Sequence, residues 1–344
     1  MAKTLLMYGE TGSMKSSNAA DIVDYLYERW GVPVLGVFGD NRGPLQSQVN
    51  RGRLIPWDIY THSDPLGCII AASTGYWPVR LEDGRAVGPL KLRTGDAWNE
   101  ISGFLVEGLT ENGMLIMRDR EMKRCSTGEP LVALTSELIA GTNETIHYAM
   151  GSRGTYQFAQ IQTHRYVKNG FAKLPVPWVI MTAHESKGTD ENGRPVYGPV
   201  IVGRAMIDTI PQWFDNTIHM DKYFFDVTVT GKDAKKTKTT IKRQGARAFF
   251  TGHVDAAIPT VFWAAKLGVP TDLMMEIFDA WPEGYVPLTL DRAGKYCSGV
   301  RDIIEMIDAH SDAQVRDDAE NYDAGSSNAS LDEAPAVDDA PVEQ

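Results

Sequence analysis

Short apolar runs alternate along this chain with stretches whose apolar residues recur at helical spacing. Four of the runs have the length and composition of buried strands: TLLMY (4–8), VPVLGVF (32–38), ISGFLVE (101–107) and VPWVIMTA (176–183). The segment that follows the first run, residues 15–30, has its apolar positions spaced as on one face of a helix. Strands that alternate with helices favour a mainly parallel sheet covered by helices, so the pattern predicts an α/β fold.

The second half of the chain adds strands and hairpins to this core. GPVIVG (198–203) is a further strand candidate, and HMDKYFFDVTVTGK (219–232) predicts the start of a hairpin. Two other hairpins are expected to turn at Asp83-Gly84 and at Asn192-Gly193. We therefore expect a core over 1–250, with insertions at about 64–97 and 118–150. Residues 251–310 would form a small helical appendage packed on it, with helices around FWAAKL and DLMMEIFDAW.

The negative charge of the chain is concentrated at its C-terminal end. The formal net charge is -11, and residues 311–344 contain ten acidic residues and a single arginine. This segment has almost no large apolar side chains, so burial cannot offset the entropy of ordering it. We predict a disordered acidic tail that keeps the chain in solution, or an acidic arm that competes with nucleic acid or recruits a partner.

Composition excludes several classes of site. The three cysteines are far apart in the sequence, which argues against a disulfide framework or a zinc site and favours a reducing, cytoplasmic setting. The N-terminal residues lack a signal-peptide pattern, and apolar runs fall short of the ~20 residues that span a bilayer. The sequence also lacks a nucleophile elbow and a dinucleotide-binding G-x-G-x-x-G after a strand.

The strongest motif lies between the first strand and the first helix. Its residues GETGSMKS match the phosphate-binding pattern G-x-x-x-x-G-K-[ST] except at the second glycine. The candidate nucleotide-binding residues are Gly9, Glu10, Thr11, Gly12, Ser13, Met14, Lys15, Ser16 and Ser17. Successive backbone N–H groups in such a turn cradle phosphate oxygens at the positive end of the helix. Lys15 would neutralise the β- and γ-phosphates. Met14 replaces the usual glycine, which is tolerable if its φ is negative and its side chain points away from the phosphates.

A nucleotide with Mg²⁺ also needs a carboxylate at the end of a neighbouring buried strand. GFLVEGLTE supplies Glu107 in that position, where aspartate is more usual. We therefore expect Ser16 and Glu107 to hold the metal, the latter through water. Asp40, after the strand 32–38, is the first candidate for orienting the attacking water, and Glu10 is the second. His184 or Thr182, at the end of VIMTA, would sense the γ-phosphate.

Together these motifs resemble a known family. YGETGSMKS, FLVEGLTE, VIMTAHE and GPVIVGRAMIDTIPQWFDNTIHM are similar to segments of the phage-encoded RecA-like P-loop ATPases of the AAA-domain group, over residues 3 to 250. Relatives in that group act with single-strand annealing and recombination proteins. The resemblance implies a RecA-like P-loop NTPase core, ATP with Mg²⁺, and work on DNA as a homo-oligomer. Met14 and Glu107 depart from the common pattern.

RecA-like ATPases generally complete their site with a basic residue from the next subunit, since a cation stabilises charge on the transferring phosphoryl group. Arg204, Arg243 and Arg247 are the candidates. A basic stretch at 230–247 could contact DNA phosphates, single-stranded DNA being favoured, although lysines also protect exposed strand edges. Its cations are Lys232, Lys235, Lys236, Lys238, Lys242, Arg243 and Arg247.

Two functions from different classes follow from the sequence. The first is an oligomeric ATPase of DNA recombination, replication or packaging. The second is a nucleotide-binding structural or regulatory assembly module in which Met14 and Glu107 have slowed turnover. Hydrolysis stimulated by single-stranded DNA would favour the first, and tight binding without turnover the second.

Overall fold

The fold comes from a computed structural model of the 344-residue chain. The residues that it describes are 2–39, 42–58, 76–80, 86–91, 97–126, 134–138, 145–149, 153–189, 195–202, 207, 209–230, 238–254, 262–290 and 296–327. None of the described helices is long and apolar enough to cross a membrane.

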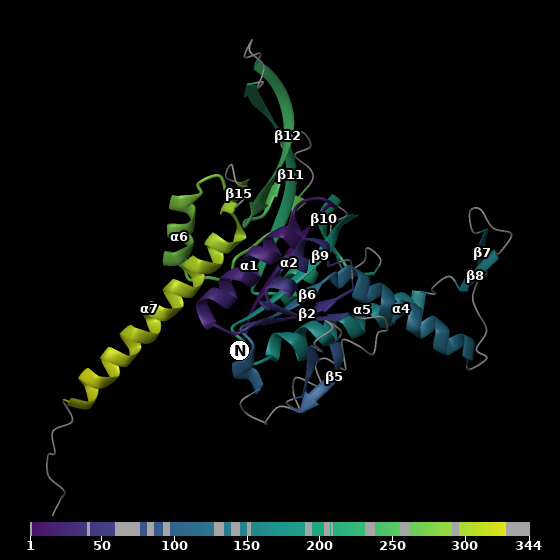
Figure 1. The fold of residues 1–344 in the computed structure, drawn as a ribbon, viewed down its shortest axis with the longest axis horizontal. Helices are drawn as coiled ribbons and strands as arrows, with labels where there is room; N and C mark the ends of the chain where they lie inside the picture. Colours follow the sequence, from purple (N-terminus) through teal and green to yellow (C-terminus); the bar gives the residue numbers. More distant parts are fainter. Residues whose placement is uncertain are drawn as a thin grey trace, which may run out of the picture.

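A large mixed sheet forms the centre of the molecule (Figure 1). Its parallel part runs in the spatial order β3 (Leu54–Asp58), β2 (Val34–Phe38), β6 (Gly103–Glu107), β9 (Trp178–Thr189), β1 (Lys3–Gly9) and β11 (Asn216–Thr230). One strand, β9, therefore separates the strand that leads into the glycine-rich loop from the strand that ends at Glu107. This order, with the loop at the end of β1, confirms the predicted α/β fold with a mainly parallel sheet.

Antiparallel strands extend the sheet on both sides. Beyond β11 lie β12 (Lys238–Phe249), β15 (Tyr285–Leu290) and β16 (Tyr296–Ser298). The second half of β9 pairs with β10 (Pro195–Val200), and β14 (Phe262–Trp263) and β13 (His253–Val254) follow. Separate two-stranded sheets are made by β4 (Tyr76–Arg80) with β5 (Ala86–Lys91) and by β7 (Leu134–Leu138) with β8 (Thr145–Ala149). The predicted hairpin pairings are confirmed, whereas their turns at Asp83-Gly84 and Asn192-Gly193 lie outside the described residues.

Helices cover both faces of the sheet, and each face has its own hydrophobic core. One cluster joins strand residues such as Leu5 and Ile218 to α1 (Lys15–Trp30), α6 (Thr271–Ala280) and α7 (Val300–Ser327). The other joins residues such as Leu6 and Val106 to α4 (Leu109–Ser126) and α5 (Arg153–Arg165). The alternation along β1 explains this division, because successive side chains of a strand point to opposite faces.

Short helical segments complete the described chain. They are η1 (Gly43–Leu45), α2 (Gln46–Asn50), η2 (Ala97–Glu100), η3 (Tyr166–Gly170), η4 (Phe171–Lys173) and η5 (Ile210–Trp213). All of them lie in connections that precede strands of the large sheet.

The C-terminal segment departs from the sequence prediction in two places. FWAAKL is not a helix: Phe262 and Trp263 form β14, and the backbone of Lys266 forms a two-way bridge with Thr217 at 2.8 and 2.9 Å. The appendage therefore contains strands as well as helix α6. Helix α7 also continues to Ser327, so the tail is helical well beyond residue 311, and residues 328–344 lie outside the described residues.

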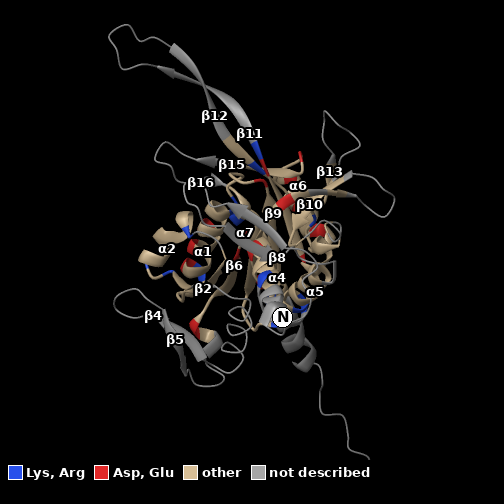
Figure 2. Ribbon diagram, turned by 90° about the vertical axis from the view of Figure 1, so that its right-hand side faces the viewer, with Lys and Arg blue, Asp and Glu red and all other residues tan. Residues whose placement is uncertain are grey.

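The two strands β11 and β12 continue beyond the sheet as a ribbon. β1 pairs with β11 only as far as Met220, whereas β12 stays paired with β11 up to Thr230. Figure 1 shows the ribbon projecting from the body, and Figure 2 shows its base beside β15. The ribbon leaves the sheet at the end where the glycine-rich loop lies, because parallel β1 and β11 end at the same edge.

Candidate functional site

The glycine-rich loop connects β1 to α1 at the carboxyl edge of the parallel strands, where ligands of open α/β sheets bind. Its first residue has to be glycine: a Cβ atom on Gly9 would lie 2.1 Å from the carbonyl oxygen of Met220. Gly12 has a φ of 84°, a left-handed conformation that suits glycine. These two positions shape the turn as a phosphate-binding loop requires.

Met14 adopts the conformation that glycine would have in this loop. Its φ is 66° and its ψ 22°, and it is the only non-glycine residue with positive φ in the part of the chain that the structure describes. The condition of a negative φ, under which a side chain would fit easily, is therefore not met. The methionine side chain packs against the hydrophobic cluster that includes α6 and α7. That contact offsets part of the cost of a left-handed backbone, which is roughly 1–2 kcal/mol for a side-chain-bearing residue.

Lys15 folds back over the loop that precedes it. Its ammonium group donates hydrogen bonds of 2.8 Å each to the carbonyl oxygens of Gly9 and Glu10, and the side chain is largely buried. A buried ammonium held by carbonyl oxygens gains from an anion, because phosphate oxygens offer stronger charge-assisted bonds than neutral carbonyls. The position of Lys15 therefore suits a phosphate.

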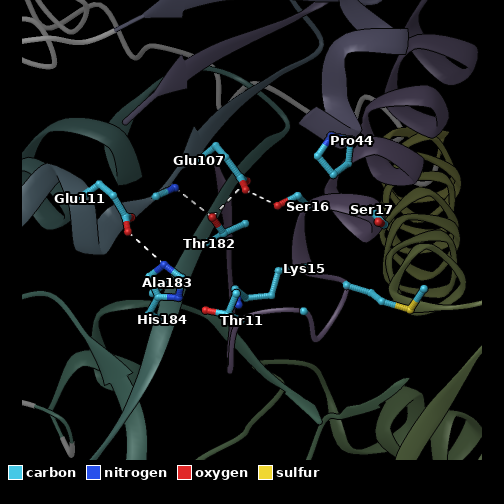
Figure 3. A pocket seen from close by; sticks show the side chains of 13 residues that line it. Thr11, Lys15, Ser16, Ser17, Pro44, Glu107, Glu111, Thr182, Ala183 and His184 are labelled. Carbon is cyan, nitrogen blue, oxygen red and sulfur yellow. Dashed lines mark hydrogen bonds and ion pairs between the residues drawn. The ribbon is translucent and has the colours of Figure 1, made fainter. Parts of the chain in front are cut away.

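Glu107 lies at the end of β6 and meets the start of α1. One of its carboxylate oxygens accepts a hydrogen bond from the Ser16 hydroxyl, and the other accepts a 3.0 Å hydrogen bond from the Thr182 hydroxyl (Figure 3). The backbone N–H of Gly108 in turn donates to Thr182 at 2.9 Å. Glu107 is only 4% exposed. The structure thus brings Ser16 and Glu107, predicted from distant motifs, into direct contact.

His184 and Glu111 form the neighbouring wall of the site. The Nε2 atom of His184 lies 3.0 Å from the Glu111 carboxylate, and the backbone N–H of His184 donates to the Thr110 hydroxyl at 2.9 Å. Burial alone would raise the pKa of Glu111, but the hydrogen bond from His184, a backbone hydrogen bond, and the charges of His184 and Lys15 outweigh it. The pKa of Glu111 is consequently below its ordinary value, and the carboxylate stays charged.

These residues line one cavity of about 320 Å³, the size of a small-molecule site. The lining includes Gly12, Lys15, Ser16, Glu107 and His184. Hard oxygen donors such as the Ser16 hydroxyl and the Glu107 carboxylate suit Mg²⁺, and one buried oxygen of Glu111 has no hydrogen-bond partner. The described residues form no cluster of three or more metal-ligating side chains, so Mg²⁺ would take its other ligands from phosphate and water.

A second hollow adjoins this cavity on the side of β11. It has a volume of about 440 Å³ and is lined by Glu10, Thr11, His184, Glu185 and Lys222. Across it, the Lys222 ammonium lies 2.6 Å from the Glu10 carboxylate, which raises the pKa of Lys222. Glu10, a candidate base, is therefore paired with a lysine in this structure.

Behind the second hollow lies a buried chain of ionisable groups. Glu185 contacts His219 at 2.7 Å, and the other ring nitrogen of His219 lies 3.3 Å from Nε2 of His253. The ring of His253 stacks on those of Phe249 and Trp263. Burial, and then the neighbouring His219, lower the pKa of His253 to about 4.

Several predicted residues are not brought to the site by the described structure. Asp40, Arg204 and the lysines Lys232, Lys235 and Lys236 lie outside the described residues, and Lys238, Lys242 and Arg243 are described only as backbone of β12. Arg247 is described and is engaged within the chain: it pairs with Asp221, and its guanidinium lies over the rings of Phe249 and Tyr285.

Sequence reasoning missed Glu111, Glu185 and Lys222. Glu111 follows Glu107 by four residues in the same motif, and Glu185 follows His184 directly. Their places in the sequence therefore already indicated that both lie near the site. Lys222 carried none, because its place beside Glu10 depends on β11 pairing with β1 rather than on any local pattern.

Comparisons with known proteins add little to the description of the site. No protein-family model matches the sequence, and no curated protein matches it. Among solved structures, a KaiC-like protein of the hyperthermophilic archaeon Pyrococcus horikoshii OT3 is similar at 10% sequence identity and a TM-score of 0.32. The alignment covers 72% of this chain and 77% of that chain. The account of the site therefore rests on the strand order, the loop and the contacts described above.

Proposed function

We propose that this chain binds ATP with Mg²⁺ at the glycine-rich loop and hydrolyses it. The observation that carries the proposal is the contact of Ser16, the last residue of the loop motif, with the buried Glu107 carboxylate at the end of β6. A glycine-rich turn without a function would not be expected to contact a buried carboxylate that also accepts a hydrogen bond from the Thr182 hydroxyl. A metal–phosphate site needs this pairing of hydroxyl and carboxylate beside a phosphate cradle.

Each described residue has a role in this proposal. The loop N–H groups and the positive end of α1 bind the β-phosphate, and Lys15 exchanges the Gly9 and Glu10 carbonyls for phosphate oxygens. Ser16 and Glu107 hold Mg²⁺, which when bound neutralises charge on the phosphates. Thr182 fixes the orientation of Glu107, and His184, kept in place by Glu111, faces the end of the phosphate chain.

We further propose that the protein works on DNA as a homo-oligomer, in recombination, replication or packaging, and that it is phage-encoded. The sequence resemblance to phage RecA-like ATPases supports this, and so does the projecting β11–β12 ribbon, whose sequence carries the basic stretch. Asp40 remains the first candidate for orienting the attacking water, and Arg204 and Arg243 remain candidates for acting on a neighbouring subunit's nucleotide. Arg247 is a weaker candidate, because it is already paired with Asp221.

The alternative is a structural or regulatory assembly module that binds nucleotide with little turnover. The left-handed Met14 and the longer arm of Glu107 favour it, since both alter the surroundings of the phosphates and the metal. The two proposals share nucleotide binding and differ in hydrolysis.

Binding is tested first, by titrating purified protein with a fluorescent ATP analogue with and without Mg²⁺. We expect Mg²⁺-dependent binding that the Lys15→Ala change weakens by about tenfold or more, because a charge-assisted phosphate contact is lost. Lys173→Ala, at an exposed position of η4, is the matched control. Equal affinity for the Lys15 variant and the wild type would contradict the proposed site.

A further inference from the structure

The cleft around the loop does not end at Lys15. The hollow lined by Glu10, Thr11, His184, Glu185 and Lys222 shares Thr11 and His184 with the cavity that contains Lys15 and Glu107. The two hollows therefore adjoin each other at the carboxyl ends of β9 and β1. A chain of phosphates that began at the start of α1 and passed Thr11 and His184 would have its far end in the second hollow.

Lys222 is positioned at that far end by the pairing of β11 with β1. Gly9, the last residue of β1, pairs with Met220, so Lys222 lies just past the point where the loop leaves the sheet. Its ammonium binds the Glu10 carboxylate at 2.6 Å, while Lys15 binds the Glu10 carbonyl at 2.8 Å. Two lysines thus hold the same loop residue from different sides.

The Glu10–Lys222 pair is poorly suited to stabilising the fold. The two side chains are 59% and 35% exposed, and ion pairs that face water contribute little to stability. A terminal phosphate carries more negative charge than a carboxylate and offers three strong acceptor oxygens. It would therefore displace Glu10 from Lys222, and the displaced carboxylate is free to turn to water because it is already mostly exposed.

We propose that Lys222 binds the terminal phosphate of a nucleoside triphosphate, in the same chain, and so distinguishes a triphosphate from a diphosphate. Glu10 holds Lys222 in place until that phosphate arrives. Glu185, buried against His219, also lines the hollow, and its negative charge favours the charged ammonium of Lys222. This inference rests on the proposed nucleotide site, and it makes Lys222 the residue that selects a triphosphate over a diphosphate there.

The test compares the dissociation constants of Mg²⁺-ADP and of a non-hydrolysable β,γ-imido ATP analogue, by calorimetry. In Lys222→Ala we expect affinity for the triphosphate analogue to fall by about 10- to 100-fold, the loss of a charge-assisted hydrogen bond, with ADP affinity unchanged within about twofold. Glu10→Gln should tighten the triphosphate analogue selectively, because it removes the competitor for Lys222. Lys222→Arg should keep part of the preference for the triphosphate analogue over ADP. Lys173→Ala should change neither dissociation constant.

The outcomes separate this inference from the proposed function. If the wild type binds both nucleotides and Lys222→Ala weakens both equally, or neither, the inference is overturned and the nucleotide site stands. If the wild type binds neither nucleotide, the proposed function falls and the inference with it. Melting curves of each variant confirm that it is folded, and Lys222→Arg, which keeps the charge, provides the test should the alanine variant not fold.

Discussion

At the scale of single residues, Met14 shows how this loop keeps its shape with an unusual sequence. The backbone at this position is left-handed, as is common for glycine. The methionine side chain packs against the cluster that contains residues of the C-terminal helices. The substitution has therefore changed what the loop touches rather than how it is bent. A nucleotide site with this geometry remains open, because the side chain is partly buried in the apolar cluster.

Two substitutions at Met14 test this description. Met14→Ala keeps the left-handed strain and loses the packing, whereas Met14→Gly loses the packing but relieves the strain. We expect the glycine variant to be more stable than the alanine variant by about 1 kcal/mol, the reverse of the order in an ordinary helix or strand. Urea unfolding of the two variants measures the difference. An alanine variant at least as stable as the glycine variant would mean that φ at this position is negative.

His253 predicts how stability depends on pH. Its pKa is lowered to about 4, so the unfolded chain, with an ordinary histidine, binds the proton more readily than the folded chain. Stability should therefore fall as the pH drops from about 6.5 to about 4 and level off below that range. Because the ring is partly screened by water, we expect a loss of about 1–2 kcal/mol from this group.

The measurement is the urea midpoint at several pH values for the wild type and for His253→Phe. Phenylalanine keeps a ring that can stack on Phe249 and Trp263 but cannot take a proton. The variant should show a flatter profile between pH 6.5 and 4. The same change at His310, which lies 3.8 Å from Asp272 of α6, tests whether the loss of any histidine has this effect. Identical slopes for the wild type and His253→Phe would contradict the assignment.

At the scale of elements, the C-terminal helix is tied to the sheet by one buried carboxylate. Asp308 of α7 accepts hydrogen bonds from Lys3 at 2.9 Å, from the Trp178 indole at 3.0 Å and from the Tyr25 hydroxyl at 3.0 Å. It is 4% exposed and connects β1, β9 and α1 to the helix. The helix is thus held against the core by buried hydrogen bonds.

Removal of this carboxylate should be costly. We expect Asp308→Ala to lower the free energy of unfolding by about 3–5 kcal/mol, because Lys3, Trp178 and Tyr25 lose a buried partner together. Asp312→Ala, one turn further along α7, removes a half-exposed partner of Arg29 and should cost less than about 1 kcal/mol. Chemical denaturation compares the two. Similar losses in both variants would show that Asp308 does not anchor the helix.

The elements that the sequence predicted correctly are those with a strong local pattern. Apolar runs predicted the strand before the loop and the strand that ends at Glu107, and helical spacing of apolar residues predicted α1. FWAAKL was misread because its two alanines, its lysine and its leucine are strong helix formers. In the structure, pairing with β10 and β13 and a bridge to Thr217 override that preference, and such partners are invisible in a local window.

At the scale of the whole molecule, the class of fold followed from the alternation of strands and helices, but the strand order did not. The insertion of β9 between β1 and β6 brings Thr182 to Glu107, and β11 on the other side of β1 brings Lys222 to Glu10. Lys15, Ser16, Glu107, Thr182 and His184 could therefore be named from motifs. The contact of Thr182 with Glu107 and the place of Lys222 beside Glu10 depend on neighbours that only the sheet arrangement defines.

The central proposal is that the site at Ser16 and Glu107 binds and hydrolyses ATP, and that the protein uses this hydrolysis in its work on DNA. Steady-state ATP turnover tests it most directly. Purified full-length protein is assayed with Mg²⁺, with and without single-stranded DNA, beside Lys15→Ala. The account predicts turnover that DNA stimulates and that the lysine change abolishes. ATP that binds without turnover above the Lys15→Ala level, with or without DNA, would contradict the ATPase and leave a nucleotide-binding assembly module.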